Sequence, residues 1–152
     1  MARPTNEEDP RGAISALAEL RLAELAGWTP AEHAALLQLG RARLQRGEWA
    51  AACGLLDYAV LLDPGAPDTW ELVAGVRMAG RRWAEALAAL ELAFSLERSW
   101  RRAAVAALCC ERLGDAVRAK RWRGAARAEA PADEQEQRRM ARALAPGEQE
   151  AS

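Results

Sequence analysis

The side chains that most often carry out chemistry are few in this chain and are poorly spaced for it. There are three cysteines, Cys53, Cys109 and Cys110, and one histidine, His33. A structural zinc site takes about four ligands, commonly in Cys-x-x-Cys pairs, and the sequence has no such pair. His33 opens a predicted helix, where we expect an exposed side chain and not the base of a cysteine nucleophile. The sequence therefore predicts no metal site and free cysteines in a reducing compartment.

Other catalytic signatures are also missing from the sequence. It contains no pattern typical of a phosphate-binding loop, a dinucleotide-binding loop, a serine hydrolase or a zinc protease. The acid pairs Glu7/Glu8 and Glu148/Glu150 lie near the chain ends, where we expect too little burial to shift a carboxyl pKa usefully. We therefore predict no catalytic residue, no cofactor and no enzymatic activity.

The composition favours helices. Of the 152 residues, 51% are hydrophobic but only 5% are aromatic, and alanine and leucine dominate. These two residues are strong helix formers, whereas strands are enriched in β-branched and aromatic residues. An all-α protein of about one domain follows from this composition and length.

Charge is distributed unevenly along the chain. The net charge is −1, but nine basic and 14 acidic residues lie in 1–97, against 12 basic and six acidic in 98–142. A basic face that meets an acidic partner is one interpretation; solvated helix surfaces are the other. The candidate basic residues are Arg101, Arg102, Arg118, Lys120, Arg121, Arg123 and Arg127. Only Trp122 and Trp100 lie among them for base stacking, so we predict no nucleic-acid partner.

No segment of the sequence has the features of a membrane or secretion signal. No apolar stretch reaches the ~18–20 residues that a bilayer span needs, and the N-terminus lacks an apolar signal core. We therefore expect a cytoplasmic protein that does not insert into membranes.

Two helices are predicted before the chain begins to repeat. After a flexible N-terminus (1–9), an amphipathic helix is expected over 10–27, with apolar residues at Ile14, Leu17, Leu20, Leu22 and Leu25. A capping box, Thr29-Pro30-Ala31-Glu32, then predicts a helix that stops at Gly47.

A repeat of about 34 residues organises the rest of the chain. Trp49, Ala52, Leu56 and Ala59 return 34 residues later as Trp83, Ala86, Leu90 and Ala93. Gly47, Gly80 and Gly114 mark the turns, and the third unit is fainter, with Arg123 where a large apolar residue is expected and Trp122 beside it. This period and these residues resemble tetratricopeptide repeats, in which helix–turn–helix units stack into an α-solenoid. The resemblance implies a repeat domain over 28–131 and a polar C-terminal extension over 132–152.

In tetratricopeptide proteins the first helix of each unit lines a concave groove. Carried onto this chain, the resemblance places there Ala34, Leu37, Arg41, Leu44, Gln45, Asp68, Glu71, Gly75, Met78, Ala79, Arg101, Ala104, Leu108, Glu111 and Arg112. The floor is small or apolar and the edges are charged. Such a groove suits an extended apolar segment of another chain.

A narrower resemblance rests on four stretches, Leu44–Trp49, Val60–Asp63, Gly75–Trp83 and Ala106–Asp115. They are similar to the tetratricopeptide chaperones of bacterial type III secretion systems that hold the pore-forming translocators. Residues 52–64 are equally similar to a smaller chaperone of an early export component of the same machines, and both alternatives stay open. The helix over 10–27 resembles the dimerisation helix of this family; it either pairs two copies or packs on the first repeat.

The resemblance implies a non-enzymatic chaperone. It would hold a secretion substrate or export-apparatus protein in the groove and keep it soluble and export-competent. The alternative is a general scaffold that links subunits of another assembly. The two differ in the partner: one aggregation-prone client for the chaperone, and stable folded subunits for the scaffold.

Overall fold

The computed structural model describes residues 27–145. This part of the chain is helical and contains no strand, which confirms the predicted all-α class. Its helices are α3 (Pro30–Gln45), α4 (Trp49–Leu62), α5 (Pro67–Ala79), α6 (Trp83–Leu96), α7 (Trp100–Arg112), α8 (Ala116–Ala128) and α9 (Glu134–Leu144). Between residues 27 and 145, no helix is long and apolar enough to cross a membrane. The N-terminal helix predicted over 10–27 lies outside the described residues, except for Gly27 in the turn before α3.

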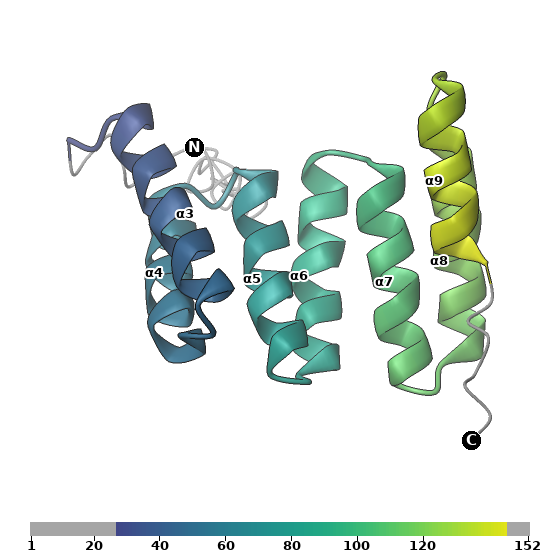
Figure 1. Ribbon diagram of the computed structural model, residues 1–152, viewed down its shortest axis with the longest axis horizontal. Coiled ribbons are helices and arrows are strands. Elements are labelled where there is room, and N and C mark those ends of the chain that lie inside the picture. Colours follow the sequence, from purple (N-terminus) through teal and green to yellow (C-terminus); the bar gives the residue numbers. More distant parts are fainter. Residues whose placement is uncertain (1–26, 146–152) are drawn as a thin grey trace, which may run out of the picture.

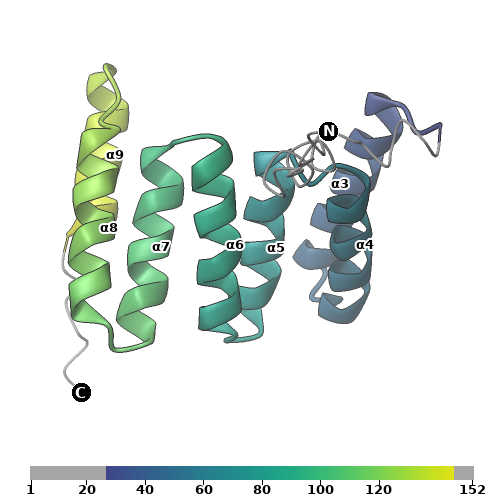
Figure 2. The same ribbon diagram turned by 180° about the vertical axis from the view of Figure 1, so that it is seen from behind.

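Successive helices form three pairs that stack in chain order. Figure 1 shows the pairs α3/α4, α5/α6 and α7/α8 following one another along the long axis of the molecule. In the view from behind, α4 and α8 lie in front of α3 and α9 (Figure 2). We call α3, α5 and α7 the A helices and α4, α6 and α8 the B helices. The last helix, α9, packs against the A helix α7.

The first A helix starts where the sequence predicts. The Thr29 hydroxyl accepts a hydrogen bond from the backbone N–H of Glu32 (3.3 Å), and the Glu32 carboxylate accepts one from the Thr29 N–H (2.8 Å). With Pro30 in the first turn, this reciprocal arrangement is the predicted capping box. The side chains of Ser99, Asp115 and Asp133 cap α7, α8 and α9 in the simpler one-bond manner.

The three turns between A and B helices are built alike. In each turn a backbone N–H reaches back five residues to a carbonyl of the A helix, which closes the helix end as in a Schellman motif. The bonds run from Glu48 to Arg43 (3.0 Å), from Arg82 to Arg77 (2.8 Å) and from Asp115 to Cys110 (2.9 Å). The repeat seen in the sequence is therefore also a repeat of backbone hydrogen bonds.

One turn departs from the predicted glycine pattern. Gly47 and Gly114 have φ values of 73° and 75°, in the left-handed region that glycine adopts without strain. In the second repeat the left-handed residue is Arg81, with φ 58°, whereas Gly80 has φ −80° and closes α5. The predicted marker Gly80 is therefore one residue early, because the turn itself repeats at positions 47, 81 and 114.

Small side chains at the helix crossings form the core, as predicted. Ala52, Ala86 and Ala119 are at most 1% exposed, and so are Ala59, Ala93 and Ala126. Leu56 and Leu90, which hold the same place in the first two repeats, are buried as well. Side chains this small let two helices approach closely, so the alanine stripe fixes the stacking distance of the repeats.

The tryptophans follow the prediction only in part. Trp83 is half-buried against the core. Trp49, which was expected in the core, lies beside the turn at Gly47 but is 46% exposed. The described chain has no helix before α3 to cover that end of the stack. In the third repeat Trp122 packs into the core while Arg123 stays partly exposed, which agrees with the sequence.

Candidate functional site

Two of the three cysteines are buried, whereas Cys53 and the histidine are half-buried. Cys109 and Cys110 are buried in α7, and burial raises the pKa of the Cys109 thiol to about 11 and that of Cys110 in the same direction. Thiols that stay protonated at neutral pH are poor nucleophiles. His33, which we expected to be exposed, is half-buried, and its Nε2 atom lies 3.3 Å from the Ala59 carbonyl oxygen. Across residues 27–145, no group of His, Cys, Asp or Glu side chains is arranged to hold a metal ion.

The predicted groove residues all lie on the A helices. We call the surface that they form the A-helix face. Its exposed members are Ala34, Arg41, Gln45, Asp68, Glu71, Ala79, Arg101, Leu108, Glu111 and Arg112. Leu37, Leu44, Gly75 and Met78 are half-buried, and Ala104 is buried.

The apolar members of the first two repeats lie over the core. Leu37, Leu44 and Met78 pack against the main cluster of buried side chains, with part of their surface left to solvent. A methyl group built on Gly75 would lie 3.9 Å from Leu44 Cδ2, an ordinary van der Waals distance, so Gly75 on α5 and Leu44 on α3 are neighbours. These residues therefore serve the core as well as the surface, and a charged residue at Leu44 or Met78 would also weaken packing.

The charged edge of the A-helix face is largely occupied by internal ion pairs. Glu71 on α5 accepts a hydrogen bond from Arg102 Nε on α7 (3.0 Å), and Asp68 accepts one from Arg102 Nη2 (2.9 Å). The Arg102 side chain is only 6% exposed, so it belongs to the packing between repeats and not to the predicted basic face. Two acidic residues one turn apart, followed one repeat later by an arginine, are the sequence signal for this bridge.

The third repeat adds a cavity that the sequence did not reveal. Three predicted groove residues, Ala104, Leu108 and Glu111, line it from α7. The end of α9 closes the other side with Ala143 and Leu144, and Leu144 is itself buried. The cavity has a volume of about 350 Å³, and the ion pair between Arg123 and Glu111 lies at its wall.

One ion pair and a small apolar contact hold α9 at this position. Arg101 on α7, a predicted groove residue, donates to the Glu136 carboxylate (2.7 Å), which also accepts from Arg139. These two guanidinium groups lower the pKa of Glu136 by hydrogen bonds and by their charge. Met140 and Leu144 pack against α7 and α8 residues in the second cluster of buried side chains. The polar extension predicted after residue 131 therefore contains a helix that covers part of α7.

The structure brings some of the predicted site residues together and leaves others apart. Ala104, Leu108 and Glu111 come together around one cavity, and Leu44 and Gly75 are neighbours across α3 and α5. Ala34, Arg41 and Gln45 lie on α3, which contacts α4 and α5 within the described chain. Arrangements of this kind offer a surface for another polypeptide, with small apolar floors between charged rims.

Comparison with known proteins identifies the fold. No protein-family model matches the chain, and no curated protein sequence does. Among solved structures, the Yersinia enterocolitica type III secretion translocator chaperone SycD is 17% identical with a TM-score of 0.73, over 80% of this chain and 94% of that one. A type III secretion complex from Aeromonas hydrophila gives 20% identity and a TM-score of 0.76, over 88% and 93% of the two chains.

A third solved structure was determined with a bound partner. The chaperone PcrH of Pseudomonas aeruginosa, in complex with the chaperone binding region of PopB, is 24% identical with a TM-score of 0.70, over 78% of this chain and 98% of PcrH. The chain therefore has the tetratricopeptide-like fold of type III secretion translocator chaperones, as the sequence resemblance implied.

Proposed function

We propose that this protein is a cytoplasmic, non-enzymatic chaperone that binds a type III secretion substrate on its A-helix face. The observation that supports the proposal best is the match of nearly the whole of PcrH, a chaperone solved with the chaperone binding region of PopB, to this helix stack. SycD has likewise been solved with a peptide of the translocator YopD. By analogy, the client of this protein is a secreted translocator or a component of the export apparatus.

The A-helix face suits such a client. Leu37, Leu44 and Met78 are half-buried there, and Leu108 is exposed beside a cavity of about 350 Å³. An extended segment places alternate side chains on one side, so these apolar side chains and the cavity beside Leu108 can contact every second residue of a bound strand. Because a bound client is removed from the pool that aggregates, binding alone keeps it soluble, with no need for an energy source.

The proposal leaves α9 with a defined role. It lies along α7, where Arg101 binds Glu136, and its residue Leu144 closes one wall of the cavity that Leu108 lines. A client segment that runs along the A-helix face ends at this wall. The second part of the proposal is a homodimer that forms through the helix expected over 10–27. That helix resembles the dimerisation helix of the family, and it lies outside the described residues.

The experiment that tests the function is isolation of the tagged protein from its own cells, with mass spectrometry of what co-purifies. A chaperone yields one dominant secreted or export-apparatus protein in near-stoichiometric amount. Stable soluble subunits of another complex would instead identify a scaffold, and the chaperone proposal would then be wrong although the fold would stand.

A further inference from the structure

The helix α8 carries an unusual concentration of positive charge. Its 13 residues include five basic side chains and no acidic one. The basic residues are Arg118, Lys120, Arg121, Arg123 and Arg127. A run of like charges on one helix is unfavourable unless other groups neutralise it, so the partners of these side chains are informative.

Internal partners neutralise only part of this charge. Arg118 pairs with Glu91 of α6 (2.5 Å), and Arg123 pairs with Glu111 of α7. Within residues 27–145, Lys120, Arg121 and Arg127 make no ion pair, and all three are exposed. Three cationic groups on one helix are therefore available to an acidic ligand.

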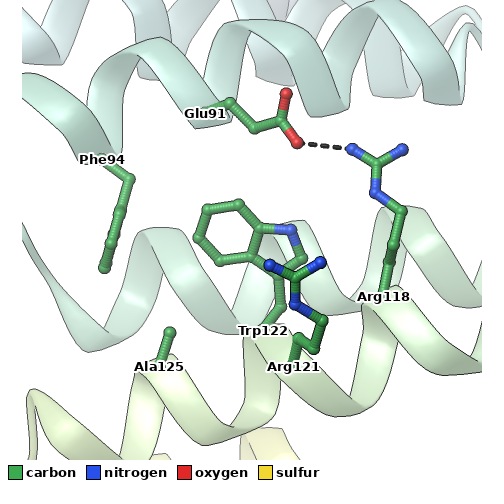
Figure 3. A pocket seen from close by; sticks show the side chains of 6 residues that line it. All are labelled: Glu91, Phe94, Arg118, Arg121, Trp122 and Ala125. Carbon is green, nitrogen blue, oxygen red and sulfur yellow. Dashed lines mark hydrogen bonds and ion pairs between the residues drawn. The ribbon is translucent and has the colours of Figure 1, made fainter.

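One of these cations borders a cavity. A hollow of about 350 Å³ lies between α6 and α8, lined by Glu91, Phe94, Arg118, Arg121, Trp122 and Ala125. Figure 3 shows the Trp122 indole at the centre of this group, with the Arg118–Glu91 pair along one side and Phe94 on the other. The rings of Trp122 and Phe94 meet edge to face, with centroids 5.2 Å apart. Both rings are half-buried, so the cavity has an aromatic wall and a cationic rim.

We propose that this cavity is a second docking site, which takes an acidic protein segment with one large apolar or aromatic side chain. That side chain enters the hollow and packs against the Phe94 and Trp122 rings, and neighbouring carboxylates of the segment lie against Arg121 and Lys120. Volume and composition fit, because ligand pockets of about 300–1,000 Å³ combine apolar walls with a few polar groups. Guanidinium groups also bind carboxylates with two parallel hydrogen bonds.

The site is separate from the A-helix face. All six lining residues come from the B helices α6 and α8, whereas the proposed client surface belongs to α3, α5 and α7. A partner here can bind while a client is held elsewhere on the molecule. The inference thus goes beyond the proposed function and does not depend on it.

The chemistry favours a protein segment over RNA. Single-stranded nucleic acids bind along several aromatic faces on which successive bases stack. Here the two rings are half-buried and engaged with each other, so they do not offer a row of exposed faces for successive bases. A single apolar hollow with cations along one side matches a short acidic motif that carries one apolar side chain.

The test measures binding of a fluorescein-labelled Asp-Asp-Glu-Trp-Glu-Asp-Asp peptide to the full chain by fluorescence anisotropy. We expect saturable binding that Arg121→Glu weakens by about tenfold or more, because a lining cation becomes an anion. The matched control Arg127→Glu makes the same charge change on the same helix, outside the cavity, and weakens binding by less than about threefold. Ala125→Leu, which fills the cavity without changing charge, also weakens binding.

Several results would overturn the inference. They are the absence of binding, equal losses in Arg121→Glu and Arg127→Glu, or undiminished binding of a peptide with serine in place of tryptophan. Displacement of the peptide by poly-uridine at low concentration would assign the surface to RNA instead. Thermal melting checks that each variant is folded. The peptide with serine in place of tryptophan tests the apolar contact on the wild-type chain, where no variant can fail to fold. Leu108→Glu, on the A-helix face, leaves peptide binding unchanged, so failure here is distinguishable from failure of the chaperone proposal.

Discussion

Arg102 on α7 places its Nε atom 3.0 Å from the Oε2 atom of Glu71 on α5, and so joins two successive A helices. The same guanidinium donates to the carboxylate of Asp68 and to the backbone carbonyl of Glu97 (2.9 Å each). An arginine that is buried while its carboxylate partners are exposed acts as a clamp between repeats. The acidic edge of the A-helix face is therefore held in place from within the molecule.

Removal of this clamp should weaken the stack. We expect Arg102→Ala to lower the free energy of unfolding by about 2 kcal/mol, since hydrogen bonds to charged groups contribute roughly 1.5–3 kcal/mol each and solvent compensates the exposed carboxylates. Chemical denaturation measures the change. Arg41→Ala, an exposed A-helix arginine without an ion pair in the described chain, is the control and should stay within about 0.5 kcal/mol of wild type. Equal effects of the two substitutions would contradict the clamp.

Gly40 on α3 lies in close contact with Leu56 on α4. A Cβ built on it would lie 2.8 Å from Leu56 Cδ2 and 3.2 Å from Leu56 Cγ, and Leu56 is 1% exposed and cannot move aside. Gly40→Ala should therefore destabilise the protein by about 1–3 kcal/mol through overpacking. Gly54→Ala, in α4 with open space around it, should instead stabilise it by roughly 0.5–1 kcal/mol. Thermal melting of the two variants should give shifts of opposite sign, and shifts of the same sign would place the crossing elsewhere.

Arg81 stores conformational strain in the second turn. Its φ of 58° lies in the left-handed region, which costs an L-residue roughly 1–2 kcal/mol. Arg81→Gly should therefore raise the free energy of unfolding by about 1 kcal/mol, as measured by denaturant titration. Gly47→Ala makes the reverse change at the equivalent turn and should lower it by a similar amount. A neutral or destabilising Arg81→Gly would show that the strain is absent in solution.

Thr69 carries a polar group that the fold leaves unsatisfied. Its residue is fully buried, and its Oγ1 atom has no hydrogen-bond partner in the described structure. Thr69→Val keeps the shape and removes the buried hydroxyl, so it should stabilise the protein by about 1 kcal/mol. The same substitution at Thr29 removes the capping box and should destabilise by about 1 kcal/mol. Calorimetry distinguishes the two, and a destabilising Thr69→Val would show that the hydroxyl has a partner.

Local signals in the sequence predicted much of the fold. The capping box at Thr29 and the buried alanines at 52, 59, 86 and 93 could be predicted because each depends on the spacing of nearby residues. The structure confirms both. Properties that arise between distant segments were not predictable in the same way. Arg102 looks like any surface arginine until α5 supplies its carboxylates, and Leu144 is the buried residue of a polar helix only because α7 lies beside it.

The same distinction between local signals and long-range contacts applies to the candidate site. Assignment to the A helices follows from repeat register, so the sequence predicted which helices carry the residues proposed for the groove. How far each side chain is exposed depends on its neighbours, which is why Ala104 is buried while Leu108, four residues later, is exposed. The cavity beneath Leu108 needs α9, whose docking no repeat pattern encodes.

Client binding on the A-helix face is tested most directly by co-expression. The identified client is produced with this protein or with one of two leucine variants of this protein, and its solubility is measured. Leu108→Glu puts a charge on the A-helix face beside the cavity, and Leu61→Glu puts the same charge at an exposed position on α4. We expect a soluble client with wild type and Leu61→Glu, and an aggregated client with Leu108→Glu or with no chaperone. A client that stays soluble alone, or equally soluble with both variants, would contradict client binding on the A-helix face.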